Sequence, residues 1–199
     1  LPEGSVIGTS SIRRRSQVLS LRKDLSIKLL RGNVDTRIQK LRNKEYDAVI
    51  LSLAGLARLN LDHLVTEVLE HNLFLPAACQ GAVGVQALKS SKLKQIFAPI
   101  NDRKTQTECI AERRILKKIN ANCNSPVSVH ANINKNNISL KFEIFDHQGN
   151  KIFKKSVEDL KQNYLKLCDE LGKEIINIVG QTKINELDNL KSDFDYTPS

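Results

Sequence analysis

The sequence contains no methionine and no tryptophan, and only 5% of its residues are aromatic. Because translation begins with methionine and this sequence begins with Leu1, we expect a processed chain or a fragment. No apolar run approaches the roughly 18 residues of a membrane span, and the early run at residues 5–7 is too short for a signal peptide. With 9 glycines and 5 prolines in 199 residues, collagen-like and disordered classes are excluded. We therefore expect a soluble globular protein.

Cysteine pairs of the kind that bind zinc are also missing. The four cysteines lie 30, 14 and 45 residues apart, without a CxxC pair or a histidine at ligand spacing, so we predict no metal site. The chain does not look like a small disulfide scaffold, and we expect reduced thiols in a cytoplasmic protein. Cys79, Cys109 and Cys168 fall among small or apolar residues, which favours packing roles over chemistry.

The net charge of +9 is concentrated near one end, since residues 1–44 carry +8 of it. Such a surplus predicts an anionic partner. Residues 1–44 contain no Phe, Tyr or Trp, so nothing there offers a platform on which nucleic-acid bases stack. We favour a small polycarboxylate or phosphate over nucleic acid. A basic nucleic-acid binder and a non-catalytic small-anion-binding module remain as alternatives.

A strand, a turn and a helix follow one another three times in the first part of the chain. The expected strands and helices are strands at residues 5–7, 27–30 and 48–51, and helices at 12–22, 34–43 and after 52–55. This alternation predicts a parallel sheet covered by helices on both faces.

The turns of this predicted sheet indicate a binding site. Ligands of open parallel sheets bind beyond the carboxyl ends of the strands, where helix N-termini present unpaired N–H groups to anions. Each turn has arginines nearby, and arginine binds carboxylates in a bidentate geometry. These arginines are Arg13, Arg14, Arg31, Arg37 and Arg58. The sequence therefore predicts a cleft for a small carboxylated ligand.

The second half of the sequence differs from the first in composition and in the order of its expected elements. Small and apolar residues at 77–85 predict a crossover and a buried strand, where Gly81 and Gly84 indicate close backbone approach or a hinge. The further elements we expect are a helix at 105–119, strands at 127–133, 138–145 and 151–157, a hairpin at 146–150, an amphipathic helix at 164–179 and a frayed polar tail from residue 185. We thus predict an α/β fold in which a partial, periplasmic-binding-protein-like parallel-sheet domain precedes a small α+β C-terminal domain with a three-stranded antiparallel sheet.

Cys123 differs from the other cysteines because it lies in a polar turn, Asn120-Ala121-Asn122-Cys123-Asn124-Ser125-Pro126, between a helix and a strand. An exposed thiol of this kind forms covalent bonds if its pKa is lowered or its partner is electrophilic. The four histidines are scattered through the sequence and suggest no relay with an aspartate. Cys123 is therefore our candidate for covalent chemistry.

Several motifs together resemble one enzyme family. They are Gly8-Thr9-Ser10-Ser11-Ile12-Arg13-Arg14, Leu30-Arg31-Gly32-Asn33-Val34-Asp35-Thr36-Arg37, Glu45-Tyr46-Asp47-Ala48, Ala54-Gly55-Leu56-Ala57-Arg58-Leu59, Gln80-Gly81-Ala82-Val83-Gly84 and Ala111-Glu112-Arg113 followed by the Cys123 loop. In this order, from near residue 5 to about residue 180, they resemble the porphobilinogen deaminases, also called hydroxymethylbilane synthases.

The resemblance implies a transferase of haem and tetrapyrrole biosynthesis. Such an enzyme joins four porphobilinogen molecules head to tail into hydroxymethylbilane and releases ammonia at each step. Cys123 would carry a dipyrromethane cofactor through a thioether. The resemblance further assigns cofactor binding to Thr9, Ser10, Ser11, Arg13, Arg14, Asn33 and Gly55, and substrate binding to Arg31, Arg37 and Arg58. It also implies a cytoplasmic monomer whose partner is porphobilinogen, with no role for nucleic acid, membrane or metal.

The resemblance also divides the chain into parts. Residues 1–72 would be most of the family's second domain, residues 73–102 a crossover with a remnant strand of the first domain, and residues 103–199 the third domain. The family's first domain supplies an acid–base aspartate that has no counterpart in these residues, so we expect residues 1–199 alone to be inactive. Ala121 and Asn122 stand where the family has two glycines before the cofactor cysteine.

Overall fold

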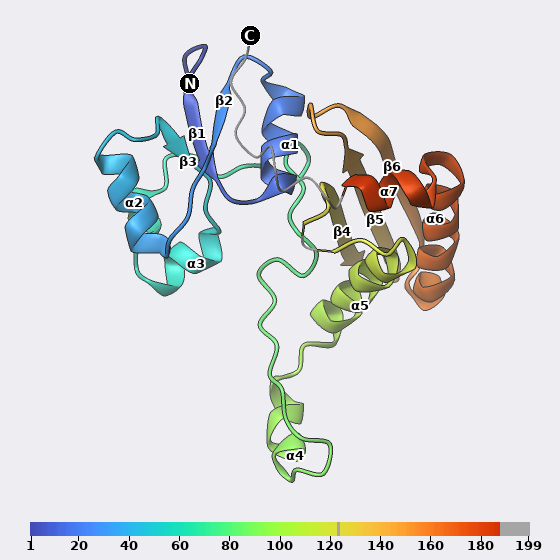
Figure 1. Cartoon of the computed structure of the whole chain (residues 1–199). Helices are drawn as coiled ribbons and strands as arrows, with labels where there is room; N and C mark the ends of the chain where they lie inside the picture. Colours follow the sequence, from blue (N-terminus) through green and yellow to red (C-terminus); the bar gives the residue numbers. More distant parts are fainter. Residues whose placement is uncertain (123, 188–199) are drawn as a thin grey trace.

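A computed structural model describes residues 1–122 and 124–187 of the chain. These residues form two separate three-stranded sheets (Figure 1). A long connecting segment, residues 59–102, lies between them in sequence. Among them no helix combines the length and apolar character needed to cross a bilayer.

The first sheet is parallel, with strand order β2-β1-β3. Its elements are β1 (Val6–Thr9), α1 (Ile12–Leu21), β2 (Ser26–Leu29), α2 (Val34–Arg42), β3 (Ala48–Val49) and α3 (Leu53–Arg58). The predicted alternation of strands and helices is therefore confirmed. The core of this half is small, since it consists of Ile7, Val18, Leu19, Leu25, Ile27 and Phe74. Phe74 lies well beyond the sheet in sequence, so the connecting segment helps to close this core.

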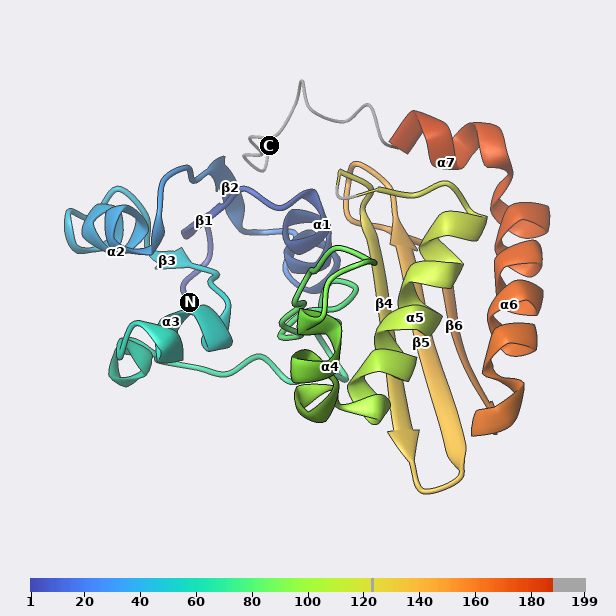
Figure 2. The ribbon, with the colours of Figure 1, turned by 90° about the horizontal axis from the view of Figure 1, so that it is seen from below.

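The second sheet is antiparallel, with strand order β4-β5-β6. Its elements are α5 (Arg103–Lys118), β4 (Val127–Asn134), β5 (Asn137–Phe145), β6 (Lys151–Leu160), a 3-10 turn η3 (Lys161–Asn163), α6 (Tyr164–Val179) and α7 (Gln181–Leu187). Helices α5 and α6 lie side by side over one face of the sheet (Figure 2). The alternation of β5 explains this packing, because Ile138, Leu140, Phe142 and Ile144 are buried in the core that the helices share.

In this half one prediction is confirmed and one is wrong. Cys168 is fully buried on α6, as predicted, and burial raises the pKa of its thiol to about 12. The prediction of a frayed polar tail from residue 185 is wrong for residues 185–187, because α7 covers residues 181–187. Ile184 and Leu187 bury their side chains in the core, and these two apolar residues give the helix a reason to dock. Residues 188–199 lie outside the described part of the chain.

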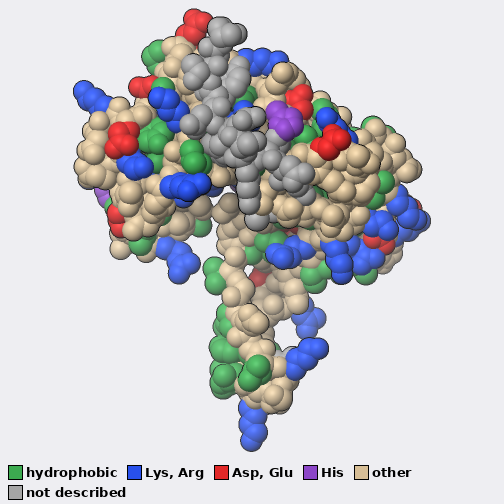
Figure 3. Space-filling model, in the orientation of Figure 1, with side chains coloured by type: hydrophobic (Ala, Val, Ile, Leu, Met, Phe, Trp, Pro, Cys, Tyr) green, Lys and Arg blue, Asp and Glu red, His purple; other side chains and the backbone are tan. Residues whose placement is uncertain are grey.

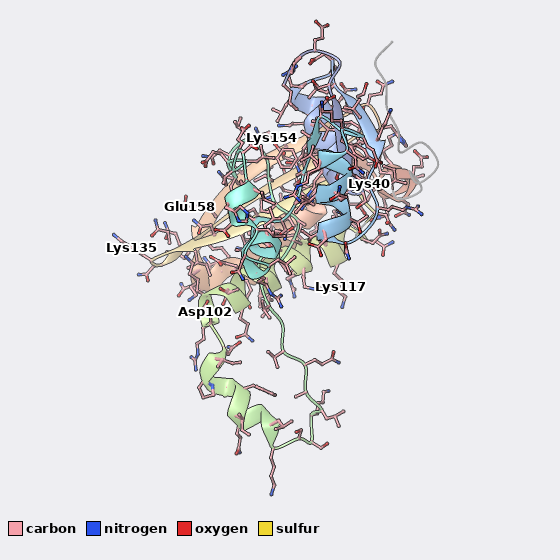
Figure 4. All side chains as sticks on the ribbon, turned by 90° about the vertical axis from the view of Figure 1, so that its left-hand side faces the viewer. Lys40, Asp102, Lys117, Lys135, Lys154 and Glu158 are labelled. Atoms are coloured by element: carbon pink, nitrogen blue, oxygen red, sulfur yellow. The ribbon has the colours of Figure 1, made fainter. Side chains whose placement is uncertain are left out.

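The connecting segment contradicts the prediction of a buried strand. It contains the short helices η1 (Asp62–Leu64), α4 (Leu93–Phe97) and η2 (Ala98–Ile100), but residues 81–90 are all exposed and form no strand. Nothing lies within 4 Å of a Cβ built at Gly81 or Gly84, so close backbone approach is also wrong there. A strand needs a hydrogen-bonded neighbour, and no described strand pairs with these residues. Instead residues 81–101 extend away from both sheets as an arm that returns to α5 at Asp102 (Figure 4).

Helix α1 lies between the two sheets and joins them (Figures 1 and 2). The tip of the β5–β6 hairpin packs directly on it, because a Cβ at Gly149 would lie 2.5 Å from Leu19 Cβ. Two hydrogen bonds flank this contact. Arg15 Nη1 donates to the His147 carbonyl at 2.8 Å, and Lys23 Nζ donates to Asn150 Oδ1 at 2.9 Å. The hairpin thus fixes α1 relative to the second sheet.

Candidate functional site

A pocket of about 350 Å³ opens at the carboxyl ends of the parallel strands. Its lining comes from the first turn of α1, the turn after β2, the turn after β3 and the connecting segment. The lining residues are Arg14, Gly32, Asn33, Val34, Arg37, Leu51, Ser52, Gly55 and Gln80. No member of this set is an aspartate or glutamate, so the pocket wall carries positive charge only.

Three turns at the carboxyl ends of the parallel strands build the pocket wall, and a helix begins after each of them. Ser11 begins α1 and accepts a hydrogen bond from Arg14 N, and Asn33 begins α2 and accepts one from Thr36 N at 2.8 Å. Ser52 begins α3 but makes no such capping bond. Its Oγ instead accepts from Gln80 Nε2 at 3.2 Å, which brings the connecting segment to the pocket.

Arg14 and Arg37 supply the charge of the pocket. Backbone carbonyls orient both side chains, since Arg14 Nη1 donates to the Ile50 carbonyl at 2.7 Å and Arg37 Nε donates to the Gly32 carbonyl at 2.8 Å. Burial and, after it, the positive charge of Arg37 lower the pKa of Arg14. Among the residues described, no carboxylate forms an ion pair with either guanidinium within 4 Å. Two neighbouring cations without a counterion make this an anion-binding arrangement.

Arg13, the neighbour of Arg14, points elsewhere. It is buried, and its Nη1 donates to the Leu75 carbonyl, to which Gln17 Nε2 also donates at 3.1 Å. Burial and the adjacent Arg14 lower the pKa of Arg13 to about 10. The side chain therefore fastens the connecting segment to α1 and is not part of the pocket wall.

The structure thus separates the predicted binding residues into two groups. Arg14, Asn33, Arg37 and Gly55 line the common pocket. The six that do not line it are Thr9, Ser10, Ser11, Arg13, Arg31 and Arg58. Thr9 and Ser10 still support the site, because Thr9 Oγ1 accepts from Ser11 N and Ser10 Oγ accepts from Arg37 Nη2. Arg31 and Arg58 are exposed.

Cys123 lies outside the described residues, but both flanks of its loop are described. Asn122 N donates to Ser125 Oγ at 2.8 Å, and Asn124 N donates to Asn122 Oδ1 at 2.8 Å. Asn120 has a left-handed backbone, with φ of 55°, and neither Ala121 nor Asn122 has a positive φ. Replacing two glycines by Ala121 and Asn122 therefore needs no strained backbone at those positions.

One hydrophobic cluster includes residues beside the cysteine loop and in the first turn of α1. Ala121 packs against the hydrophobic cluster of the second sheet, and Ile12, from the first turn of α1, belongs to that same cluster. Ile12 is two residues from Arg14 in sequence. The cluster thus connects the start of the cysteine loop with the helix that supplies a pocket arginine.

Five lining residues were not predicted as binding residues, namely Gly32, Val34, Leu51, Ser52 and Gln80. Of these, Ser52 and Gln80 have polar side chains. Ser52 had a detectable signal, because it follows a predicted strand as Ser11 and Asn33 do. Gln80 had no detectable sequence signal beyond its place in a motif, because its hydrogen-bond partner Ser52 lies 28 residues away in sequence.

Comparison with known proteins finds matches to both halves of the chain. The family model described as "Porphobilinogen deaminase, dipyromethane cofactor binding domain" matches residues 1–95, and that described as "Porphobilinogen deaminase, C-terminal domain" matches residues 106–177. Similar curated proteins are named porphobilinogen deaminase. That of Clostridium kluyveri is 38% identical over 179 residues, 89% of this chain and 60% of the relative. That of Campylobacter jejuni subsp. doylei is 38% identical over 178 residues, 88% of this chain and 58% of the relative. The chain therefore spans about 60% of the length of these relatives.

Proposed function

Because this chain belongs to the porphobilinogen deaminase family, we propose that the full-length product of its gene joins four porphobilinogen molecules into hydroxymethylbilane with release of ammonia. The observation that carries this proposal is the pocket wall, which presents Arg14 and Arg37 without any lining carboxylate. Porphobilinogen and the growing pyrrole chain carry an acetate and a propionate on every ring. A small, positively charged pocket suits such a ligand.

The same pocket fits the dipyrromethane cofactor, and we propose that Cys123 holds it through a thioether. Among the described residues no carboxylate pairs with either guanidinium, and the cofactor's side chains are carboxylates. When bound, the cofactor supplies the primer to which the first porphobilinogen is joined. Support for the attachment comes from the polar Cys123 loop, whose flanking residue Ala121 shares a hydrophobic cluster with Ile12 at the start of α1.

The residues of the chain then have distinct tasks. Arg14 and Arg37 bind carboxylates, and the backbone carbonyls of Ile50 and Gly32 keep the two side chains in place. Asn33 and Gln80 offer neutral polar groups at the same wall. We propose that Arg31 and Arg58, which are exposed, bind substrate carboxylates outside this wall, and that Thr9, Ser10, Ser11, Arg13 and Gly55 support the cofactor side of the site.

The two hydrophobic clusters and two sheets support a division into domains. We propose that residues 1–72 and 103–199 belong to two domains, with residues 73–102 as the crossover. We also propose a periplasmic-binding-protein-like architecture for the parallel-sheet part, because its site lies at the carboxyl ends of the strands. The unpaired cysteines of the described part, Cys79, Cys109 and Cys168, support a reducing, cytoplasmic location. Monomeric assembly stays a prediction.

A non-catalytic anion-binding module is the alternative, because no lining residue is a carboxylate that could transfer a proton. A nucleic-acid binder has less support, since the lysines and arginines on the face in Figure 3 are scattered over both halves of the molecule.

Turnover separates these candidates. The full-length gene product is expected to consume porphobilinogen and release one ammonia for each porphobilinogen joined. The 199-residue chain alone is expected to show no turnover, because its described pocket lacks an acid–base carboxylate. Substrate consumption and ammonia are measured in parallel on both proteins. A full-length product that binds porphobilinogen without releasing ammonia would support the binding module instead.

A further inference from the structure

Glu112 on α5 is a buried carboxylate that binds two backbone amides from different parts of the chain. Its Oε2 accepts from Cys79 N at 2.5 Å, and its Oε1 accepts from Ala131 N at 2.8 Å. The side chain is only 6% exposed. Burying a charge is costly unless hydrogen bonds satisfy it, so both bonds are needed to keep the carboxylate where it is.

The bond to Ala131 has a neighbour of the same kind. Strand β4 is an edge strand, so its outward amides lack a strand partner. Glu108, one turn earlier on α5, accepts from Ile133 N at 2.7 Å, two residues beyond Ala131. The two glutamates thus occupy alternate amides of the same edge. Glu112 differs from Glu108 in its second bond, to Cys79 of the connecting segment.

That second bond controls a turn beside the pocket. Cys79 has a left-handed backbone with φ of 59°, which is unfavourable for a residue with a Cβ. The turn closes when Ala82 N donates to the Cys79 carbonyl at 3.1 Å. Gln80 is the next residue, and it lines the pocket and donates to Ser52 Oγ. A hydrogen-bonded path therefore runs from Glu112 through the Cys79–Gln80 turn to Ser52.

Other contacts hold the start of this segment on the second sheet. The His71 ring lies edge-on to His130 with centroids 5.2 Å apart, and Lys141 Nζ donates to Asn72 Oδ1 at 2.6 Å. Both contacts precede the turn by several residues. Two contacts of α5 reach the turn itself, since Glu112 accepts from Cys79 N and Cys79 Sγ donates to the Cys109 carbonyl at 3.8 Å. Of the two, Glu112 is the side chain that binds the turn backbone.

We propose that Glu112 is a positioning residue for the anion pocket. It fixes the Cys79–Gln80 turn and so keeps the Gln80 amide at the pocket wall, which couples the second sheet to ligand binding on the first. This inference rests on the proposed function for the identity of the ligand. The carboxylate touches neither substrate nor cofactor in this role, and it acts through the backbone of Cys79.

The test compares Glu112→Gln with Glu108→Gln in the full-length gene product. Each change preserves side-chain volume but converts one accepting oxygen into an amide nitrogen that cannot accept. Glu112→Gln has one accepting oxygen left for two backbone amides, so its hold on the turn weakens, whereas the oxygen left in Glu108→Gln still accepts from Ile133 N. We expect Glu112→Gln to raise the KM for porphobilinogen about tenfold at little cost in kcat, and to accelerate hydrogen exchange at residues 79–82 about tenfold or more. Glu108→Gln is expected to leave both values unchanged.

A second variant covers the possibility that Glu112→Gln unfolds. Gln80 is exposed, so Gln80→Ala is expected to fold, to raise KM about as much as Glu112→Gln, and to add nothing further in the double variant. Equal KM and exchange in the two glutamate variants, or a normal KM in Gln80→Ala, would overturn the inference. Hydrogen exchange requires no turnover, so a protein without deaminase activity would refute the proposed function while the exchange data still decide whether Glu112 holds the turn.

Discussion

Replacing Arg14 and Arg37 together by glutamine is expected to weaken porphobilinogen binding by at least about 100-fold. Each arginine lines the pocket, where the part of the chain that the structure describes places no carboxylate within ion-pair distance of it, so each can bind a ligand carboxylate. A hydrogen bond to a charged group contributes about 1.5–3 kcal/mol, and each 1.4 kcal/mol is about a factor of ten in affinity. The measurement is the KM or Kd for porphobilinogen in the full-length gene product.

The matched control is Arg42→Gln. Arg42 lies on α2 like Arg37 but is exposed in the last turn and does not line the pocket. This change removes one positive charge, as do the single pocket variants Arg14→Gln and Arg37→Gln, and is expected to alter binding less than twofold. If Arg42→Gln weakened binding as much as either single pocket variant, diffuse charge and not the pocket would explain the affinity.

The stability of the double arginine variant is expected to change by no more than about 1 kcal/mol. Its lost hydrogen bonds to the Ile50 and Gly32 carbonyls each contribute about 1 kcal/mol. Removing the repulsion between the two guanidiniums, which after burial lowers the pKa of Arg14, offsets part of this loss. Thermal unfolding of the variant and the parent checks that weaker binding does not result from unfolding.

Gly149→Ala is expected to destabilise the protein by about 2–5 kcal/mol. The residue has φ of +80°, and its new Cβ would lie 2.5 Å from Leu19 Cβ and 2.9 Å from the Ser16 carbonyl. Left-handed strain costs about 1–2 kcal/mol, and overpacking costs about 1–3 kcal/mol. Urea unfolding measures the loss, which should be accompanied by faster hydrogen exchange in α1.

Gly4→Ala separates these two costs. Gly4 has φ of +75°, but nothing lies within 4 Å of a Cβ built there, so only strain of about 1–2 kcal/mol is expected. Equal losses in the two variants would mean that the hairpin tip does not press on α1, contrary to the contact described above.

Local sequence signals predicted most of the fold. Ser11 and Asn33 begin helices where expected, and the alternation of β5 places Phe142 toward the helices. The buried strand near residue 83 was predicted from apolar composition alone. Apolar composition indicates that a segment can be buried in a core. A strand also needs a hydrogen-bonded neighbouring strand, and this pairing depends on residues far away in sequence. Residues 81–90 have no such partner among the described strands.

The binding site could be predicted from the sequence only in part. Arg14 and Arg37 converge because the carboxyl ends of parallel strands share one edge. Sequence could not show that Arg13 turns to the Leu75 carbonyl while Arg14 faces the pocket, since that depends on which side of α1 the connecting segment covers. The bond from Glu112 to Cys79 spans 33 residues and leaves no periodic trace.

The intact mass of the full-length gene product tests the central claim most directly. The account predicts that the protein carries the added mass of one dipyrromethane unit, and that Cys123→Ser removes it. Cys168→Ser is the control, because the buried Cys168 thiol, with its pKa raised to about 12, is expected to leave the adduct in place. An unmodified wild-type mass, or an adduct that persists in Cys123→Ser, would contradict the account.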